Sequence, residues 1–406
     1  MTTTARRRRA LVIGGSIGGL FAAHALRRHG WDVQVFERSA TALSGRGAGI
    51  VTHPELWQAL AHIDLDPADR LGVPVARRVT FARDGSVIGT RPFPQVTTSW
   101  DLVFRQLRAA WPDQHYALGR SLVDVEQDAD GVAARFADGT RAEGDVLIGA
   151  DGLRSSVRQA VVGEVASAYA GYVAWRGLVA ERDVPAGARA DIFDVFGFCL
   201  PPGEQFLGYP VAGPGDDLRV GHRQYNFVWY RPADEATELP RLLRDATGQV
   251  HTVSIPPPLI RDAIIDEMRA AAEAILAPQC AALVAATPRP FLQPIYDLES
   301  PRIAVGRAAL IGDAAFVVRP HPGAGVTKAA EDAITLAEML DGADDVPAAL
   351  ARYAARRLPA GARMIRRARH LGAYLQAQRR TEAERAAAER HRTPEAVMAE
   401  TATLDF

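Results

Sequence analysis

Short apolar runs and one helical run alternate along the first forty residues. Residues 10–13 are apolar and predict a buried parallel strand, and residues 17–29 predict the helix that follows. Gly30 marks the end of that helix, and residues 32–36 predict a second strand with Glu37 at its tip. This order of strand, helix and strand predicts a β-α-β unit in a parallel sheet.

Similar patterns continue further along the chain. Residues 79–81 and 86–89 predict a hairpin, and residues 121–126 and 131–136 predict a second one. Residues 102–110 have the periodicity of a helix. The first part of the chain is therefore expected to mix α and β elements.

The residue composition and pattern change between residues 167 and 290. Aromatic residues cluster there, and short β-type runs alternate with Pro/Gly turns, which predicts an antiparallel sheet covering a pocket. Residues 145–148 before this region and 304–311 after it predict buried strands, and residues 326–340 predict a helix. The Ala-, Arg- and Glu-rich tail from residue 346 predicts helices by propensity.

Three short segments, far apart in the chain, carry the candidate chemistry. They are VIGGSIGG at 12–19, GADG at 149–152 and LIGDAA at 310–315. The first predicts a glycine-rich turn between strand and helix, whose N–H groups and helix dipole can hold a pyrophosphate. The other two place an aspartate after an apolar run, where it can accept hydrogen bonds from ribose or ribityl hydroxyls. Together, in this order, they indicate FAD. The expected phosphate turn consists of Gly14, Gly15, Ser16, Ile17, Gly18 and Gly19.

Composition narrows the function classes. The chain has 406 residues and a formal net charge of −1, which gives no bulk electrostatic reason to expect nucleic acid. Its two cysteines, Cys199 and Cys280, have neither metal-ligand nor dithiol spacing, so no metal site is expected. A reducing cytoplasm suits such a chain, and no apolar run is long enough to predict a membrane span.

The N-terminus allows one competing reading. Arginines at residues 6–9 precede an apolar stretch that ends near Leu26, as in a secretory signal. However, glycines fall at the fingerprint positions of that stretch, and Glu37 ends the next strand, and a signal peptide needs neither. A solvated tail before the first strand is therefore the expectation.

With these motifs in place, the chain resembles the class A flavoprotein aromatic hydroxylases, which have the para-hydroxybenzoate hydroxylase fold. The resemblance rests on the glycine fingerprint with Glu37, on residues 145–158, and on Gly312-Asp313 through Asp332-Ala333. Within that family the chain is most similar to the 2,6-dihydroxypyridine 3-monooxygenase type. The segments that suggest this type are 171–177, 226–231, 290–295 and 315–321.

The resemblance implies an α/β fold with a Rossmann-like FAD-binding domain of the glutathione-reductase type. Residues 1–165 and 291–346 would form this discontinuous domain. Residues 166–290 would form the inserted antiparallel β-sheet domain that binds the substrate, with the 79–97 hairpin as a candidate member of that sheet. Residues 347–406 would form a C-terminal helical segment.

The resemblance also implies contacts to the adenosine half of FAD. Glu37 is expected to accept hydrogen bonds from the ribose hydroxyls. Arg38 is either a contact to adenosine or phosphate or a plain surface arginine. Trp100 stands where the family often has arginine, which leaves Arg105 as the nearest cation expected to reach a phosphate.

For the flavin half, the loop at residues 46–50 resembles the segment along the isoalloxazine edge, with Gly49 and Ile50 as contacts. Asp313 should bind ribityl hydroxyls, and Asp151 serves both FAD and the nicotinamide cofactor in the family. The loop before the helix at 326–340 would face the pyrimidine end of the flavin, where negative charge develops on reduction. Its expected contacts are Pro320, Gly323, Ala324, Gly325 and Val326.

The implied reaction is that of an NAD(P)H-dependent monooxygenase. NAD(P)H reduces FAD, dioxygen adds to give a flavin C4a-hydroperoxide, and one oxygen atom enters an electron-rich ring. A small hydroxypyridine, pyridone or phenol is the expected substrate. Some side chain must deprotonate or polarise its hydroxyl, and His53, His321 and Tyr209 are the leading candidates.

Several alternatives remain open at this stage. A flavin oxidase or epoxidase of natural-product biosynthesis, or a non-catalytic FAD-binding protein, would share the three segments. A tryptophan-type flavin halogenase would need a WxWxIP segment, and a dithiol oxidoreductase a CxxxxC pair, and the sequence contains neither. NADH versus NADPH, the identity of the substrate, and a homodimer or higher homo-oligomer are also left open.

Overall fold

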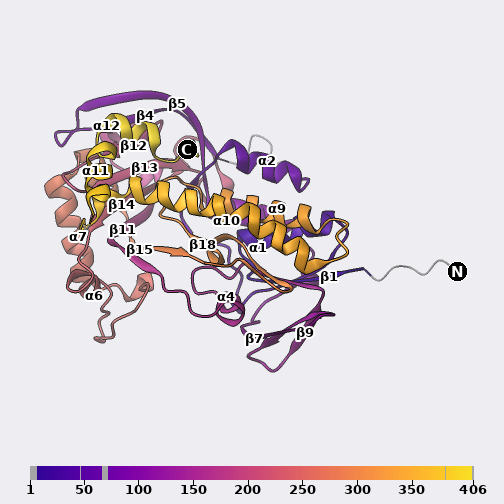
Figure 1. Cartoon of the computed structure of the whole chain (residues 1–406). Coiled ribbons are helices and arrows are strands. Elements are labelled where there is room, and N and C mark those ends of the chain that lie inside the picture. The colour runs from indigo at the N-terminus through magenta and orange to yellow at the C-terminus, as the bar shows by residue number, and fades with distance from the viewer. Residues whose placement is uncertain (1–6, 46, 66–71, 380, 405–406) are drawn as a thin grey trace.

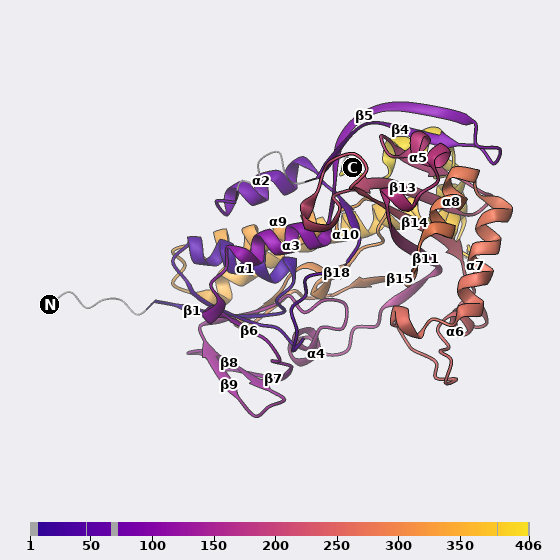
Figure 2. The same cartoon turned by 180° about the vertical axis from the view of Figure 1, so that it is seen from behind.

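The computed structural model describes residues 7–45, 47–65, 72–379 and 381–404, and Figures 1 and 2 show it from opposite sides. One layer is a 6-stranded sheet of order β16-β17-β10-β1-β2-β6, parallel except for β16. Its strands are β1 (Arg9–Ile13), β2 (Asp32–Phe36), β6 (Tyr116–Ala117), β10 (Val146–Gly149), β16 (Ala304–Val305) and β17 (Ala308–Leu310). The predicted β-α-β unit is present as β1, α1 (Ile17–Arg28) and β2.

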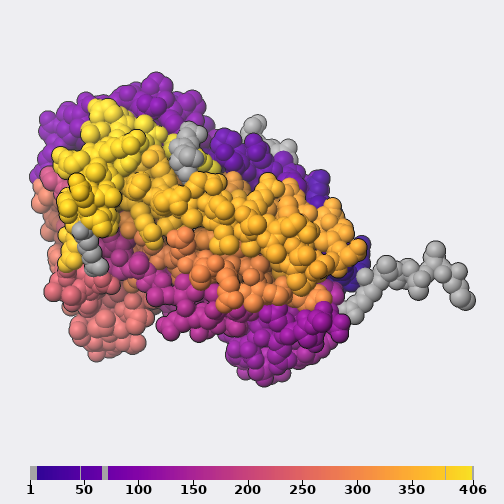
Figure 3. All heavy atoms as spheres, in the orientation of Figure 1, coloured from indigo at the N-terminus to yellow at the C-terminus, as the bar shows by residue number. Residues whose placement is uncertain are grey.

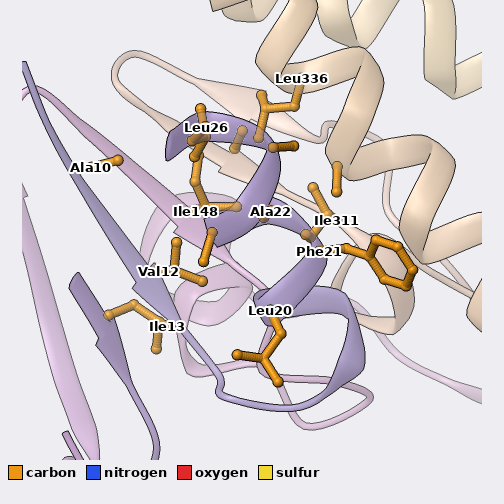
Figure 4. Close-up of a cluster of buried hydrophobic side chains, with 14 of the residues drawn as sticks. Ala10, Val12, Ile13, Leu20, Phe21, Ala22, Leu26, Ile148, Ile311 and Leu336 are labelled. Atoms are coloured by element: carbon orange, nitrogen blue, oxygen red, sulfur yellow. The ribbon is translucent and has the colours of Figure 1, made fainter. Parts of the chain in front are cut away.

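The parallel sheet is covered on both faces, which explains its continuous apolar runs. Helix α1 and helix α9 (Gly325–Leu340) pack on one face. Figure 4 shows buried side chains of this layer, with Val12 of β1 and Ile148 of β10 next to α1, and Leu336 of α9 beside Leu26. A 3-stranded sheet lies on the opposite side (Figures 1 and 2). Its strands are β7 (Leu122–Gln127), β8 (Val132–Phe136) and β9 (Arg141–Gly144).

The second layer is a 9-stranded sheet of order β18-β15-β11-β14-β13-β12-β4-β5-β3. Its strands are β3 (Gly49–Val51), β4 (Val73–Phe81), β5 (Val87–Ser99), β11 (Ala168–Ala180), β12 (Phe196–Cys199), β13 (Gln205–Val211), β14 (Gln224–Pro232), β15 (Phe291–Glu299) and β18 (Phe316–Val317). Side chains on a strand alternate between faces. One face therefore buries Trp175 and Trp229, whereas Tyr209 and Tyr230 lie in the cluster on the other face.

Helices cover the Trp175 face of this sheet, although residues 166–290 were expected to be a sheet. The difference is largest at α7, whose side chains Ile264, Met268 and Ala272 are buried at helical spacing. That spacing was readable from the sequence and was missed. The helices of this region are α5 (Ala186–Ile192), α6 (Glu238–Leu242), α7 (Asp262–Ile275) and α8 (Pro278–Ala286).

Two further segments differ from their predicted form. Residues 304–311 form two short antiparallel strands instead of one, because Gly306 turns the chain with a φ of +57°. The hairpin predicted near 79–89 extends to β4 and β5 in full, and it belongs to the 9-stranded sheet. This hairpin and β15, which were assigned by residue range to the FAD-binding domain, lie in the same sheet as residues 166–290. The domain limits given in the sequence analysis stay a prediction.

The C-terminal helices tie the two layers together. Helix α10 (Val346–Leu371) runs from the parallel sheet to the 9-stranded sheet, and α11 (Glu382–His391) and α12 (Pro394–Glu400) follow (Figure 1). In Figure 3 these orange to yellow atoms cover one face of the molecule as far as the purple β4–β5 hairpin. The remaining helices are α2 (Pro54–His62), α3 (Trp100–Ala109) and α4 (Ser156–Val161). None of the helices in the described ranges is long and apolar enough to cross a membrane.

Candidate active site

A cavity of about 920 Å³ lies between the carboxyl ends of the parallel strands and one face of the 9-stranded sheet. Such a volume is at the upper end of the range for cofactor and small-molecule sites. Its wall includes every residue of the expected phosphate turn except Gly15 and Gly19, together with Glu37, Arg38, Gly49, Ile50, Asp151 and Asp313. The described residues hold no group of His, Cys, Asp or Glu placed to bind a metal ion.

The glycine turn shows why its residues must be small. Gly14 has a φ of +106°, and a Cβ there would lie 2.4 Å from the carbonyl oxygen of Ala150. A Cβ on Gly19 would lie 1.8 Å from the carbonyl oxygen of Gly14. Ser16 takes an extended conformation at the N-cap of α1, and its side chain caps no helical N–H group. The first turn of α1 therefore keeps free donors at the cavity, as a pyrophosphate requires.

Glu37 stands at the tip of β2, where the ribose of an adenosine was expected. Its side chain is buried, and its carboxylate accepts hydrogen bonds from the N–H groups of Gly15 at 2.8 Å and Ser39 at 2.8 Å. A carboxylate has about four acceptor positions. Two of them therefore remain for hydroxyl groups in the cavity.

The two arginines expected near the phosphates have different surroundings. Arg38 lies on the cavity wall, together with Arg120. Arg105 is not among the wall residues, and its guanidinium instead binds Asp101 and Asp216. Trp100, at the position where the family often has arginine, is itself part of the wall. The geometry therefore favours Arg38 over Arg105 as a contact to the cofactor.

The two aspartates at the strand ends differ in how fully their carboxylates are already hydrogen-bonded. The carboxylate of Asp151 accepts from Ser155 Oγ at 2.5 Å and from the N–H of Ser156 at 2.7 Å, so it caps α4. Burial raises the pKa of Asp151. Asp313, in contrast, keeps 54% of its side chain exposed, and its nearest cation is Lys328 Nζ at 3.7 Å. Asp313 is therefore the freer acceptor for ribityl hydroxyls.

The loop before α9 forms the far wall of the cavity. Pro320, Gly323, Ala324, Gly325 and Val326 all lie on it. The N-cap residue Ala324 has no side-chain acceptor, and the buried Thr327 Oγ1 in the first turn has no hydrogen-bond partner among the described residues. These free donors at a helix N-terminus fit the electron-rich pyrimidine end of a flavin.

The loop opposite α9 is held against the 9-stranded sheet. The N–H of Gly49 donates to Asn226 Oδ1 at 2.9 Å. A Cβ on Gly49 would lie 2.5 Å from Asn226 Cγ, so only glycine fits. Ile50 follows on the cavity wall. Arg46, the first residue of this predicted loop, lies outside the described residues.

The three candidate acid–base residues occupy different places. His53 Nε2 lies 3.3 Å from the carbonyl oxygen of Gly323, and His53 is not among the wall residues, which favours a role in holding that loop. His321 lies on the wall, and Tyr172 OH is 2.7 Å from its Nε2. Burial and Arg319 lower the pKa of His321 to about 3. Tyr209 also lies on the wall, and burial raises its pKa.

Three polar wall residues on the 9-stranded sheet were not among the predicted site residues. They are Arg176 on β11, Tyr230 on β14 and Gln293 on β15. Arg176 Nη1 donates to Gln293 Oε1 at 2.9 Å. Segments 171–177, 226–231 and 290–295, which contain these three residues, were recognised in the sequence only as signs of the subfamily. The alternation of polar and apolar positions along β11 does not indicate which face meets the cavity.

The C-terminal segment closes the cavity, which its sequence gave no reason to expect. Thr401 and Ala402 lie on the wall, and the N–H of Ala402 donates to the carbonyl oxygen of His321 at 2.7 Å. Arg78, fully buried, donates to the carbonyl oxygens of Met398 at 2.8 Å and Thr401 at 2.6 Å. Burial and the nearby Arg91 lower the pKa of Arg78 to about 9, so the guanidinium is still charged at neutral pH.

Comparisons with known proteins agree with this geometry. A model of an NAD(P)-binding Rossmann-like domain matches residues 12–64, and a model described as FAD binding domain-like matches residues 169–297. The chain is 35% identical over 374 residues to 2,6-dihydroxypyridine 3-monooxygenase of Paenarthrobacter nicotinovorans, covering 91% of each chain.

Solved structures give the same picture. The structure of 2,6-dihydroxypyridine-3-hydroxylase from Arthrobacter nicotinovorans matches with a TM-score of 0.85 and 33% identity, covering 92% of this chain and 94% of that one. Klebsiella pneumoniae HpxO, complexed with FAD and uric acid, matches with a TM-score of 0.75 and 27% identity, covering 97% of this chain and 95% of that one. FAD and a nicotinamide reductant are therefore the cofactors of this chain.

The first prediction concerns Asp313. Replacing it with alanine removes an acceptor for the ribityl chain, so FAD affinity should fall by roughly 1–3 kcal/mol, or about 5- to 150-fold in Kd. Asp313→Asn keeps an acceptor oxygen and should lose less. Titration of the apoprotein with FAD measures both, with the exposed Asp344→Ala as the matched control. Unchanged affinity in Asp313→Ala would contradict the assignment.

A second prediction concerns Arg78. Arg78→Met leaves the carbonyl groups of Met398 and Thr401 without donors, at a cost of roughly 1–3 kcal/mol each. The Tm of the FAD-loaded protein should fall, and proteases should cut the segment after α11 more readily. Arg77→Met makes the same change at an exposed position of the same strand and should leave both properties unchanged. Equal protease resistance in the two variants would show that Arg78 does not hold the segment.

Proposed function

This chain belongs to the class A FAD-dependent aromatic hydroxylases, and from that premise we propose that it hydroxylates a small hydroxypyridine, pyridone or phenol. The enzyme is an NAD(P)H-dependent monooxygenase, so dioxygen and a nicotinamide cofactor are its other reactants. The proposal concerns the substrate class, the residues that handle the substrate, and the compartment. The observation that carries it is a single cavity that joins a dinucleotide cradle to a polar patch on the 9-stranded sheet.

FAD, when bound, carries electrons from NAD(P)H and transfers one atom of dioxygen to the ring. The protein must hold the ring in place, exclude water, and draw electron density into it. Apolar wall residues serve the first two needs, among them Phe196, Leu207 and Val228. They come from the same sheet face as Tyr209, which supplies a hydroxyl close to them.

We assign two polar contacts to the substrate hydroxyl. Tyr209 has no hydrogen-bond partner in the described part of the chain, and its raised pKa keeps it a donor at neutral pH. His321, with its pKa lowered to about 3, stays neutral and does not hold a proton from the substrate at neutral pH. Both residues therefore orient the hydroxyl by hydrogen bonding.

The cysteines and the reductant support the cytoplasm as the compartment. Cys199 and Cys280 are free and buried, which suits a reducing environment. A steady supply of NAD(P)H is also a cytoplasmic condition. Rates measured with NADH and with NADPH distinguish the two reductants.

The proposed function is tested with a panel of hydroxypyridines, pyridones and phenols. The FAD-loaded enzyme should oxidise NADH or NADPH faster when its substrate is present, and mass analysis should show a product heavier by one oxygen atom. Ligand-stimulated oxidation that yields only hydrogen peroxide, for every compound, would overturn the proposal. The flavin would then serve an oxidase.

Variants of the three candidate residues separate the two half-reactions. Tyr209→Phe and His321→Ala should slow product formation on the order of 10²-fold. Flavin reduction should suffer less, and more of the NAD(P)H consumed should end as hydrogen peroxide. His53→Ala should have a smaller effect, because His53 contacts the Gly323 loop and is not a wall residue. Near-normal rate and coupling in all three would show that none of them handles the hydroxyl.

A further inference from the structure

Arg176 is a cation that none of the roles described so far uses. It lies on β11, an interior strand of the 9-stranded sheet, with Val228 of β14 and Phe291 of β15 as its neighbours in register. Side chains two residues apart share a face, so Arg176 shares one with Ala174, whose register partners are Tyr230 and Gln293. The register thus gathers Arg176, Tyr230 and Gln293 on the cavity side, and all three line the wall.

The hydrogen-bond partners of Arg176 carry no negative charge, and its guanidinium carbon lies 5.7 Å from the centre of the Phe291 ring. Its Nη1 donates to the amide oxygen of Gln293 at 2.9 Å, and its Nη2 to the carbonyl oxygen of Gly49 at 3.4 Å. Its Nε is buried and has no hydrogen-bond partner among the residues that the structure describes. Within the described ranges Arg176 pairs with no carboxylate, so both of its partners are neutral.

The groups that face Arg176 from the neighbouring strands are donors as well. Tyr209 on β13 and Tyr230 on β14 are 3% and 2% exposed, and neither hydroxyl bonds to another described residue. The positive charge of Arg176 lowers the pKa of both, but burial raises it more, so both stay protonated at neutral pH. His321 is neutral because its pKa is lowered to about 3, so among the described residues no titrating group on this side of the cavity supplies a negative charge.

The carboxylates of the wall lie at its other end. Glu37 and Asp151 are bound by backbone N–H groups, and Asp313 lies near Lys328. They follow the carboxyl ends of β2, β10 and β17 in the parallel sheet. The cavity therefore has acceptors where FAD hydroxyls are expected, and a cation with two phenolic donors where the ring of a substrate would lie.

Arg176 is half-buried, and a cation in this position becomes costly once a bound ring displaces water from the cavity, unless an anion joins it. A guanidinium with neighbouring hydroxyl donors matches an oxyanion, because charge-assisted hydrogen bonds to such an anion are short and strong. We propose that Arg176 is the oxyanion anchor of the substrate, holding the deprotonated oxygen of a hydroxypyridine, pyridone or phenol. This inference rests on the proposed function and deepens it, since it states that the substrate is bound as its anion.

The proposal accounts for the activation of the ring without a protein base. The substrate hydroxyl releases its proton to solvent as it binds, and Arg176 stabilises the charge that remains. That charge makes the ortho and para carbons electron-rich. In the overall reaction the bound anion, dioxygen, NAD(P)H and one proton give the hydroxylated anion, NAD(P)⁺ and water.

The first experiment measures anion binding without turnover. Benzoate is the probe and benzamide its neutral isostere, and each is titrated against FAD-loaded enzyme while the flavin absorption spectrum is recorded. Wild type should bind benzoate and discriminate against benzamide. The affinity of Arg176→Met for benzoate should be lower on the order of 10²-fold, and this variant should no longer distinguish benzoate from benzamide. The affinity of Arg176→Lys should lie between those of wild type and Arg176→Met, because lysine keeps the charge but lacks the paired N–H donors of a guanidinium. Arg182→Met, just beyond the end of β11 and 81% exposed, is the matched control and should behave as wild type.

The second experiment uses 2,6-dihydroxypyridine and follows its Kd with pH. In wild type the affinity should rise as pH approaches the pKa of the probe and then level off, and the bound probe should show the absorption of its anion. Arg176→Met should lose both the pH dependence and the anion spectrum. If Arg176 only packed the sheet, Arg176→Met would keep both the pH dependence of the Kd and the anion spectrum of the bound probe.

Two outcomes would overturn the anchor. Equal benzoate binding by wild type and Arg176→Met is one. The other is a variant with an altered flavin spectrum and FAD affinity but normal probe binding, which would place Arg176 on the cofactor. Failure of the proposed function looks different, because benzoate would still bind through Arg176 while no panel compound gained an oxygen atom.

Discussion

The close approach of β1, β10 and the start of α1 is the constraint on which the cavity depends. Ala150 N–H donates to the carbonyl oxygen of Ile13 at 2.7 Å, and Gly14 N–H to that of Phe36 at 2.8 Å, so three strands end at one level. Gly14 and Gly19 leave no room for a Cβ at this crossing. The strand ends are thereby fixed side by side, and each continues directly into a residue of the wall. Any side chain at the crossing would separate the strand ends and the groups that follow them.

This constraint also explains which parts of the site were readable from the sequence. Asp151 and Asp313 were both predicted to contact FAD, because each follows a short apolar run, and the carboxyl ends of parallel strands share one edge of a sheet. Arg176, Tyr230 and Gln293 were not predicted, because their meeting depends on the register of β11 with β14 and β15. The pairing of Arg105 with Asp216 was not predicted for a related reason, since the two residues are distant in sequence and no local pattern indicates the pair. Local patterns therefore identified the cofactor, and long-range pairing decided what surrounds the substrate.

The end of the chain also shows that long-range contacts cannot be read from local sequence patterns. Residues 347–406 have helical propensity and no motif, yet Thr401 and Ala402 form part of the cavity wall. Arg78 on β4 holds them through their backbone, so the identity of the residues it contacts matters little. A contact made to carbonyl groups leaves no trace in the sequence of the segment that is held. Only the burial of an arginine within β4 marks it, and burial is a property of the fold.

The distribution of charge around the cavity gives a physical reason for its chemistry. A base that takes a proton from the substrate must lose it again in every turnover, which requires a pKa near the working pH and a path to solvent. His321 does not meet the first requirement, because burial and Arg319 lower its pKa to about 3. A fixed cation has no such requirement, because it stabilises the anion without exchanging a proton. The carboxylates of the parallel sheet stay at the cofactor end, where they cannot cancel that cation. Placing acids on one layer and the unpaired arginine on the other thus lets a single cavity serve a hydroxyl-rich cofactor and an anionic ring together.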